Sequence, residues 1–337
     1  IFCGCSEDWI GKTKKILPEV NKIIDIQHKI IGKVWEDLSV ISPDHITSSN
    51  DVYVVIVSGS FDSIEESLKD KGFLPGDDYC YSPVFEDFSV ISEFNSSEIN
   101  LLFTSSDYPL ESAVTRSSRL CGGLYLANIN GDKFDFECIY KGCIRQIVRQ
   151  HESFFAVDYH TNQILVFDKD FNLERRIDLT RRHCTGIAVN NTHIIVLSSS
   201  DDVIQFYDLN TGVIDNEVSF GLLSGKGSGS YHINDCWLEG ESLFFTYFSK
   251  TGYWRNEMFD GGVSVLNISS GVIAELITGL FQPHSPIIHE NELYFCESTM
   301  GKLFRGSHST IFESNGFLRG VGFYGDFIVF AQSETLY

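Results

Sequence analysis

Three histidines in the second half of the chain are spaced about 50 residues apart, the length of a recurring structural unit. His183 lies in HCTGIAV, His232 in HINDCW and His284 in HSPII, and each opens a short apolar run. Imidazole is a frequent ligand of zinc and related metals. If the three rings meet in space, they predict a divalent metal such as zinc with an open position for water or substrate. Asn234 and Asp235 are placed to hold a ring nitrogen or, alternatively, to bind calcium.

Two arginines, Arg145 and Arg319, open the corresponding strands of units that lack a histidine. Together with the three histidines they predict a cationic ring inside an acidic chain. Arginine binds carboxylate, phosphate and sulfate groups through paired hydrogen bonds, so the ring suits an anionic ligand. The predicted catalytic residues are His183, His232, His284, Arg145 and Arg319, and the histidines are the predicted metal ligands.

A loop insertion over residues 249–262 follows the second histidine. It places two aromatic side chains beside a cation, between glycines, which is typical of a platform that stacks on a sugar ring or closes over a ligand. The alternative is a loop packed against the edge of its blade. The predicted substrate-binding residues are Tyr253, Trp254, Arg255, Asn234 and Asp235.

The elements that position these residues are short strands repeated in groups of four. Residues 101–140 predict three strands, and residues 144–178 predict a complete four-strand unit with hairpin turns. Further units begin at His183, His232, His284 and about Leu318. Such repetition is the signature of a β-propeller, in which the residue that opens an innermost strand faces the central channel. We predict a six-bladed β-propeller over residues 98–337, whose incomplete first and last units complement each other.

The first 90 residues follow a different pattern, in which strands alternate with helices. The run YVVIV over residues 53–57 is typical of a buried parallel strand, and residues 60–71 have the apolar spacing of a helix that stops at Gly72. Strands that alternate with helices indicate a parallel sheet with right-handed crossovers. The predicted fold class is therefore α/β plus all-β, with an α/β domain over residues 1–90.

This first stretch resembles the small Rossmann-like domains attached to enzymes of bacterial surface-sugar biosynthesis. The matching segments are IFCG, IIDIQHKIIGK, VISPDHI, YVVIVSGS and the closing GFLPGDDY. The resemblance implies a nucleotide-binding turn at Gly4, with Asp25 on the ribose. However, Ser6 and Trp9 stand where the second and third glycines of a dinucleotide loop belong. We therefore expect a scaffold or docking domain that contacts a protein partner and does not hold NAD in the usual way.

The second half, over about residues 119–332, resembles a six-bladed propeller family of bacterial proteins known only as a domain of unknown function, DUF4915. The matching segments are YHIND at residues 231–235, GYWR at 252–255, GGV at 261–263, GL at 279–280, PHSP at 283–286, ES at 297–298 and GKL at 301–303. The resemblance implies the propeller fold and no particular reaction.

The composition narrows the choice of partners and compartment. The 337 residues have a formal net charge of −21, which argues against nucleic acid or an anionic membrane surface as a partner. Nine cysteines without metal-ligand spacing or a disulfide rhythm favour a reducing, cytoplasmic location. The sequence contains no run of eighteen apolar residues, so it predicts no membrane span.

Two functions of different classes follow from these patterns. The first is binding of a polar, anionic or sugar-containing small molecule at the channel mouth, with metal-dependent lyase or hydrolase chemistry in bacterial glycan or secondary metabolism. The second is a non-catalytic recognition or scaffold role in surface glycan biosynthesis, with a glycan or a protein as the partner.

Overall fold

The computed structural model describes residues 1–4, 7–24, 32, 34–35, 37–46, 52–58, 61–85, 97–106, 122–130, 133–221, 229–307, 309–325 and 327–333. The chain divides into two compact units, one formed by Ile1–Glu98 and the other by most of the chain from Ile99 onward. Each unit has hydrophobic clusters of its own. No helix among the described residues is both long and apolar enough to cross a membrane.

The first unit is built on one six-stranded sheet. Its strands are β1 (Phe2–Cys3), β2 (Lys22–Ile24), β3 (Val34–Trp35), β4 (Leu38–Ile41), β5 (Val54–Ile56) and β6 (Tyr79–Tyr81). They lie in the order β3-β4-β2-β1-β5-β6, and every pairing is parallel except that of β3 with β4. The helices are α1 (Glu7–Ile16), α2 (Phe61–Asp70) and the short 3-10 helix η1 (Pro43–His45). All three residues of β5 are buried, as an unbroken apolar run predicts for a parallel strand.

The turn after β1 is the place where a nucleotide site was predicted. Gly4 ends β1 with φ 104°, and a side chain there would collide with Ser58, so the turn requires glycine. Trp9 on α1 packs against Phe85, with ring centroids 4.4 Å apart. Asp25 and Ser6, the other residues of that prediction, lie outside the described residues.

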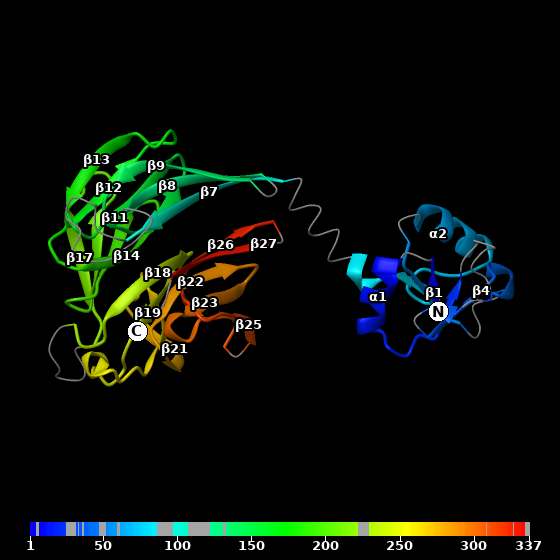
Figure 1. Ribbon diagram of the computed structural model, residues 1–337. Helices are drawn as coiled ribbons and strands as arrows, with labels where there is room; N and C mark the ends of the chain where they lie inside the picture. The colour runs from blue at the N-terminus through cyan, green and yellow to red at the C-terminus, as the bar shows by residue number, and fades with distance from the viewer. Residues whose placement is uncertain are drawn as a thin grey trace. The chain divides into compact units, whose positions relative to one another are not determined.

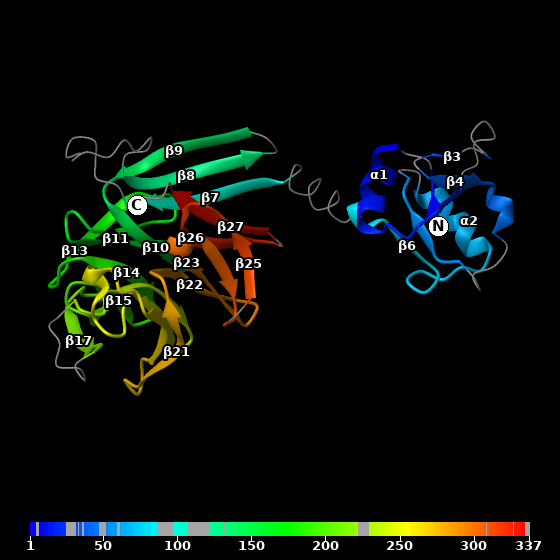
Figure 2. The same ribbon diagram turned by 60° about the horizontal axis from the view of Figure 1, so that its bottom comes forward.

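The second unit consists of antiparallel sheets arranged around a common centre in the manner of a propeller (Figures 1 and 2). Four of its sheets have four strands each, in chain order. Their strands are β10 (Ile144–Gln150), β11 (Ser153–Asp158), β12 (Gln163–Phe167), β13 (Leu173–Asp178), β14 (Cys184–Val189), β15 (His193–Ser198), β16 (Val203–Asp208), β17 (Ile214–Ser219), β18 (Ile233–Glu239), β19 (Ser242–Tyr247), β20 (Gly261–Asn267), β21 (Ile273–Leu280), β22 (Pro283–His289), β23 (Glu292–Glu297), β24 (Lys302–Arg305) and β25 (Ser309–Glu313).

Two smaller sheets complete the second unit. One pairs β26 (Phe317–Tyr324) with β27 (Phe327–Ser333), and the other joins β7 (Glu98–Ser105), β8 (Gly123–Asn130) and β9 (Lys133–Lys141). Both views show β26 and β27 beside β7 (Figures 1 and 2), but no ladder of hydrogen bonds joins them among the described residues.

Five strands, namely β10, β14, β18, β22 and β26, form the inner edge of the propeller, and each contacts the next in this order. The described inner strands therefore define five blades, of which the fifth contains only β26 and β27, and the prediction of six blades is not confirmed. The sequence pattern counts strand groups, whereas closure depends on pairing between the ends of the chain, which the described strands do not make.

Burial follows the position of a strand within its blade. The middle strands pack against neighbouring blades on both faces, so β16 is buried at five successive residues. The outer strand β17 alternates between exposed and half-buried side chains, and all of β25 is exposed. The polar surface thus lies at the rim, and the apolar runs predicted as inner strands lie inside.

Close approach of two inner strands depends on Gly186 in β14. A Cβ atom at this position would lie 2.5 Å from the carbonyl oxygen of Asn234 in β18. Because that oxygen belongs to backbone, we expect Gly186→Ala to push the strands apart and to lower the free energy of unfolding by about 1–3 kcal/mol. Urea denaturation of the purified variant measures this change.

The matched control is Gly322→Ala in β26, where nothing lies within 4 Å of the added carbon. We expect this control to unfold close to wild type. Equal stabilities of the Gly186 variant and wild type would contradict the close packing of β14 on β18.

Candidate functional site

Backbone register defines which residues of different blades are equivalent. In each blade, one buried residue near the start of the innermost strand pairs with the end, or nearly the end, of the second strand. These residues are Ile144, Cys184, Ile233, Pro283 and Leu318. The following residues form what we call the channel ring, namely Arg145, Thr185, Asn234, His284 and Arg319. A β-bulge or irregularity follows in every blade, which supports this alignment.

The predicted equivalence of the three histidines is wrong in register. His183 and His232 precede their strands and have left-handed backbones, with φ of 53° and 54°. The residue in that position of the next blade is Gln282, with φ 47°, whereas His284 lies two residues further along. A spacing of about 50 residues tolerates an offset of two, because the connecting loops differ in length from blade to blade.

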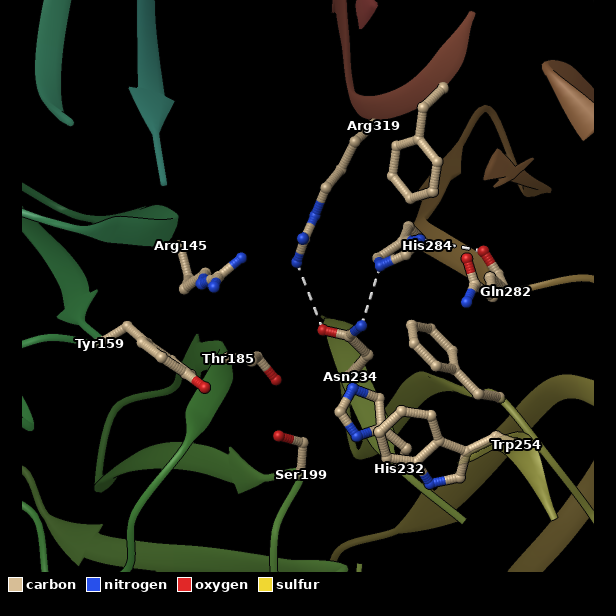
Figure 3. Close-up of a pocket in the computed structure, with 12 residues that line it drawn as sticks. Arg145, Tyr159, Thr185, Ser199, His232, Asn234, Trp254, Gln282, His284 and Arg319 are labelled. Carbon is tan, nitrogen blue, oxygen red and sulfur yellow. Dashed lines mark hydrogen bonds between the residues drawn. The ribbon is translucent and has the colours of Figure 1, made fainter. Parts of the chain in front are cut away.

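A cavity of about 240 Å³ opens at this end of the propeller. The whole channel ring lines it, and so do seven residues from adjacent turns and element ends, namely Tyr159, Ser199, His232, Phe248, Trp254, Gln282 and Phe317. Arg145 and Tyr159 lie on one side of the cavity, and His232, Trp254 and His284 lie on the other (Figure 3). His183 does not line the cavity, because its Nδ1 atom is hydrogen-bonded to the hydroxyl of Tyr159 and its side chain is exposed.

A buried carboxylate, Asp235, organises one half of the ring. It accepts a hydrogen bond from Nη2 of Arg319 at 2.6 Å and one from Nε at 3.3 Å. It also accepts the backbone N–H of Ser285 at 3.1 Å. Burial raises the pKa of Asp235, but the charge of Arg319 and the hydrogen bonds from Arg319 and Ser285 together hold the pKa below its usual range. Asp235 therefore stays ionised and neutralises Arg319.

The amide of Asn234 joins Arg319 to His284. Its Oδ1 atom accepts from Nη2 of Arg319 at 3.3 Å, so its Nδ2 atom is turned toward Nε2 of His284, at 2.9 Å (Figure 3). The proton of the imidazole then lies on Nδ1, where the carbonyl oxygen of Gln282 accepts it at 3.0 Å. Both ring nitrogens of His284 are thus engaged within the protein.

The two histidines that line the cavity are neutral at physiological pH. Burial, followed by the charge of Arg319, lowers the pKa of His284 to about 3. Burial, followed by the charge of Arg255, lowers the pKa of His232 to about 3. The predicted cationic ring therefore takes its positive charge from the arginines alone, because a buried imidazole beside a guanidinium does not protonate.

Arg145 differs from Arg319 because it has no acidic partner. No carboxylate among the described residues forms an ion pair with it, and its Nε atom is buried without a hydrogen-bond partner. The guanidinium lies over the ring of Tyr159, 4.4 Å from the ring centroid. Burial and the nearby charge of Arg319 lower the pKa of Arg145. The neighbouring blade places another buried and unpartnered atom, Oγ1 of Thr185, in the same cavity.

An unbroken series of ring contacts forms the opposite side, which we call the aromatic wall. Its members, in order of contact, are Trp254, His232, Phe248, His284 and Phe317. The centroids of neighbouring rings lie between 4.3 and 5.4 Å apart. All five rings line the cavity.

The loop that follows β19 holds Trp254 in place. Ser249 and Asp260 bond to each other at 2.6 Å, and their side chains accept the backbone N–H groups of residues 250–253. The short 3-10 helix η4 (Trp254–Asn256) follows, and the indole of Trp254 donates to the carbonyl oxygen of Gly229 at 2.9 Å. Arg255 lies 4.5 Å from the centre of the same indole ring. Tyr253 is 48% exposed and does not line the cavity.

The predicted metal site does not fit this geometry. His183 lies outside the cavity, and both nitrogens of His284 have protein partners. Across the described part of the chain, no group of three or more His, Cys, Asp or Glu side chains is arranged to hold a metal ion.

Sequence reasoning missed half of the cavity lining. It did not select Thr185, Tyr159, Ser199, Phe248, Gln282 and Phe317. Alignment of the blades by their buried strand-opening residue would have selected Thr185 beside Arg145. The others come from turns next to the inner strands, where no motif marks them.

The neutral state of His284 has a consequence for stability. The pKa of His284 is about 3 in the folded protein, whereas the ordinary value of 6.5 applies to the unfolded chain. Below about pH 6.5 the unfolded chain therefore binds a proton that the folded protein excludes. The free energy of unfolding therefore falls as the pH decreases from about 6.5 toward 3, by up to about 1.4 kcal/mol per pH unit for this residue.

The variant His284→Gln isolates this contribution. Urea denaturation at about pH 7 and about pH 5 gives the decrease in the free energy of unfolding between these two pH values for each protein. We expect this decrease to be about 2 kcal/mol larger in wild type than in the variant. Parallel pH dependence in the two proteins would contradict a buried, neutral imidazole.

Comparison with known families gives one partial match. Residues 230–336 match the model of a domain of unknown function, DUF4915. No curated protein matches the chain.

Three solved structures illustrate the similarity of fold. Regucalcin from Agrobacterium tumefaciens, a calcium-binding protein, is 14% identical over 49% of this chain and 54% of its own, with a TM-score of 0.38. The chain therefore spans about half the length of that protein. A catalytically inactive virginiamycin B lyase from Staphylococcus aureus, solved with quinupristin, is 16% identical over 69% of this chain and 96% of its own, with a TM-score of 0.41. The computationally designed Ika8 protein is 11% identical over 63% of this chain and 64% of its own, with a TM-score of 0.37. These values define neither a ligand nor a reaction for this chain.

Proposed function

We propose that the protein binds a small anionic molecule in the cavity of the channel ring, with Arg145 as the principal anchor. The observation that carries this proposal is a half-buried arginine without an acidic partner among the described residues, whose Nε atom is buried. An isolated charge in a cavity costs free energy unless a counter-charge compensates it. A carboxylate, phosphate or sulfate group of a ligand supplies that counter-charge and accepts from the unpartnered Nε atom.

Two further groups support the anion at this position. Thr185 offers its unpartnered hydroxyl from the neighbouring blade. Arg319 uses Nε and Nη2 for Asp235 and Asn234, and its Nη1 atom has no hydrogen bond to a described residue. Asp235 orients Arg319 and cancels most of its charge, so Arg319 acts as a donor of fixed direction.

Catalysis by this site has less support than binding. The predicted lyase or hydrolase depends on three histidines that converge on a metal, and the structure does not bring them together. A histidine with a pKa of about 3, such as His232, is a poor general base at neutral pH. The non-catalytic recognition role therefore becomes the favoured class, and a glycan assembly context stays a proposal.

The first unit enters the proposal only as a scaffold. Without β3, its parallel strands lie in the order β4-β2-β1-β5-β6, with the first strand of the chain at the centre, as in doubly wound folds. We propose on this basis that it is Rossmann-like and docks a protein partner. A sixth blade in the second unit remains a proposal as well.

Titration with inorganic phosphate, sulfate and acetate tests the anion site. We expect saturable heat by calorimetry for at least one of these anions. We expect Arg145→Gln to weaken that binding by about tenfold to a hundredfold, because a charge-assisted hydrogen bond contributes about 1.5–3 kcal/mol. Circular dichroism of the variant checks that its fold is retained.

The control variant is Arg149→Gln. Arg149 lies on the same strand, β10, but its side chain is 62% exposed and pairs with Glu152 outside the cavity. We expect this variant to bind the anion as wild type does. Equal loss of binding in both variants would indicate non-specific attraction and contradict the proposal.

A further inference from the structure

We propose that the anionic group of the ligand is attached to a planar aromatic ring, which packs on the aromatic wall. This inference rests on the proposed anion site and adds the chemical class of the rest of the molecule. It replaces the sugar-containing ligand expected from the sequence.

The two sides of the cavity have opposite chemistry. The side formed by Arg145 and Thr185 carries unpartnered polar atoms, whereas the aromatic wall presents ring faces and edges. Figure 3 shows Arg145 on one side of the open space and His232 and Trp254 on the other. A ligand that satisfies both sides has a charged end and a flat apolar end, because packing of one ring on another stabilises a complex beyond the burial of area.

The neutral state of His232 keeps the aromatic wall uncharged. The pKa of His232 is lowered to about 3, first by burial, so its imidazole is an uncharged ring at neutral pH. His232 contacts Trp254 and Phe248 at centroid distances of 4.3 and 4.5 Å. The three rings thus form a continuous surface.

Hydrogen bonding distinguishes an aromatic ring from a sugar. A buried sugar needs a partner for most of its hydroxyl groups, because unpaired polar groups cost free energy when water is removed. Three polar groups next to the wall are already engaged, since Asn234 and His284 bond each other and the Oε1 atom of Gln282 accepts from Thr299 at 2.7 Å. An arene makes no such demand.

Trp254 also lacks the open face that a sugar platform requires. Its ring contacts His232 and the guanidinium of Arg255, and its N–H is bonded to Gly229. The indole therefore supports His232, and His232 is the member of the wall that a ligand ring meets together with Phe248.

Three phosphate probes with the same charged group test the inference. They are inorganic phosphate, phenyl phosphate and glucose 1-phosphate, and acetate, benzoate and glucuronate form the equivalent carboxylate series. Calorimetry on the full chain gives a Kd for each. We expect the phenyl compound to bind about tenfold more tightly than inorganic phosphate, and the sugar phosphate to gain little.

The variant His232→Ala separates the two ends of the ligand. We expect the ratio of the inorganic phosphate Kd to the phenyl phosphate Kd to fall from about ten to about one. Trp254→Leu removes the support of His232, and we expect it to lower the same ratio. Trp237→Leu is the matched control, because Trp237 lies on β18 but does not line the cavity, and we expect it to keep the wild-type ratio.

The outcomes separate this inference from the function on which it rests. Equal affinity for the three phosphates, or tighter binding of glucose 1-phosphate, overturns the aromatic ligand and leaves the anion site standing. Absence of binding in both series contradicts the anion site itself. A wild-type ratio in His232→Ala shows that any aromatic preference arises elsewhere and also overturns the inference.

Discussion

The geometry of the site depends on one buried carboxylate. The side chain of Asp235, in β18, binds Arg319 two blades away and the backbone N–H of Ser285 on the blade between them. Three inner strands, β18, β22 and β26, are thereby held at a fixed spacing by charge-assisted bonds in a region from which water is largely removed. The orientation of Asn234, and through it the proton position on His284, follows from this pair.

The same interaction explains why the two arginines of the ring are not equivalent. Arg319 is compensated within the protein, so it contributes direction and little net charge. Arg145 forms no ion pair with a described residue, and its closest compensation is the face of Tyr159, with a smaller contribution from the charge of Asp235. The uncompensated positive charge of the cavity is therefore concentrated at Arg145.

Much of the fold could be predicted from the sequence because it depends on local patterns. Apolar runs bounded by turns located the strands of the four complete blades, and alternation with helices indicated the parallel sheet. The site was harder. Of the predicted site residues, Arg145, Arg319, Asn234, Trp254, His232 and His284 line one cavity, whereas His183 does not, although it has the same place in its blade as His232. The offset of His284 by two residues cannot be seen in spacing alone. Protonation was also misjudged, because the pKa of a histidine depends on burial, which only the assembled blades create.

The channel ring determines the chemistry of the cavity through side chains at a few equivalent positions. Each blade contributes one side chain at one register, and the buried residue before it maintains the strand regardless of what that side chain is. A change at Arg145 or Thr185 alters the charge and shape of the cavity without breaking a side-chain hydrogen bond between blades, whereas a change at Arg319 leaves Asp235 buried without its counter-charge. The ligand of the cavity can therefore be changed at one side of the channel ring while the other side keeps the inner strands together.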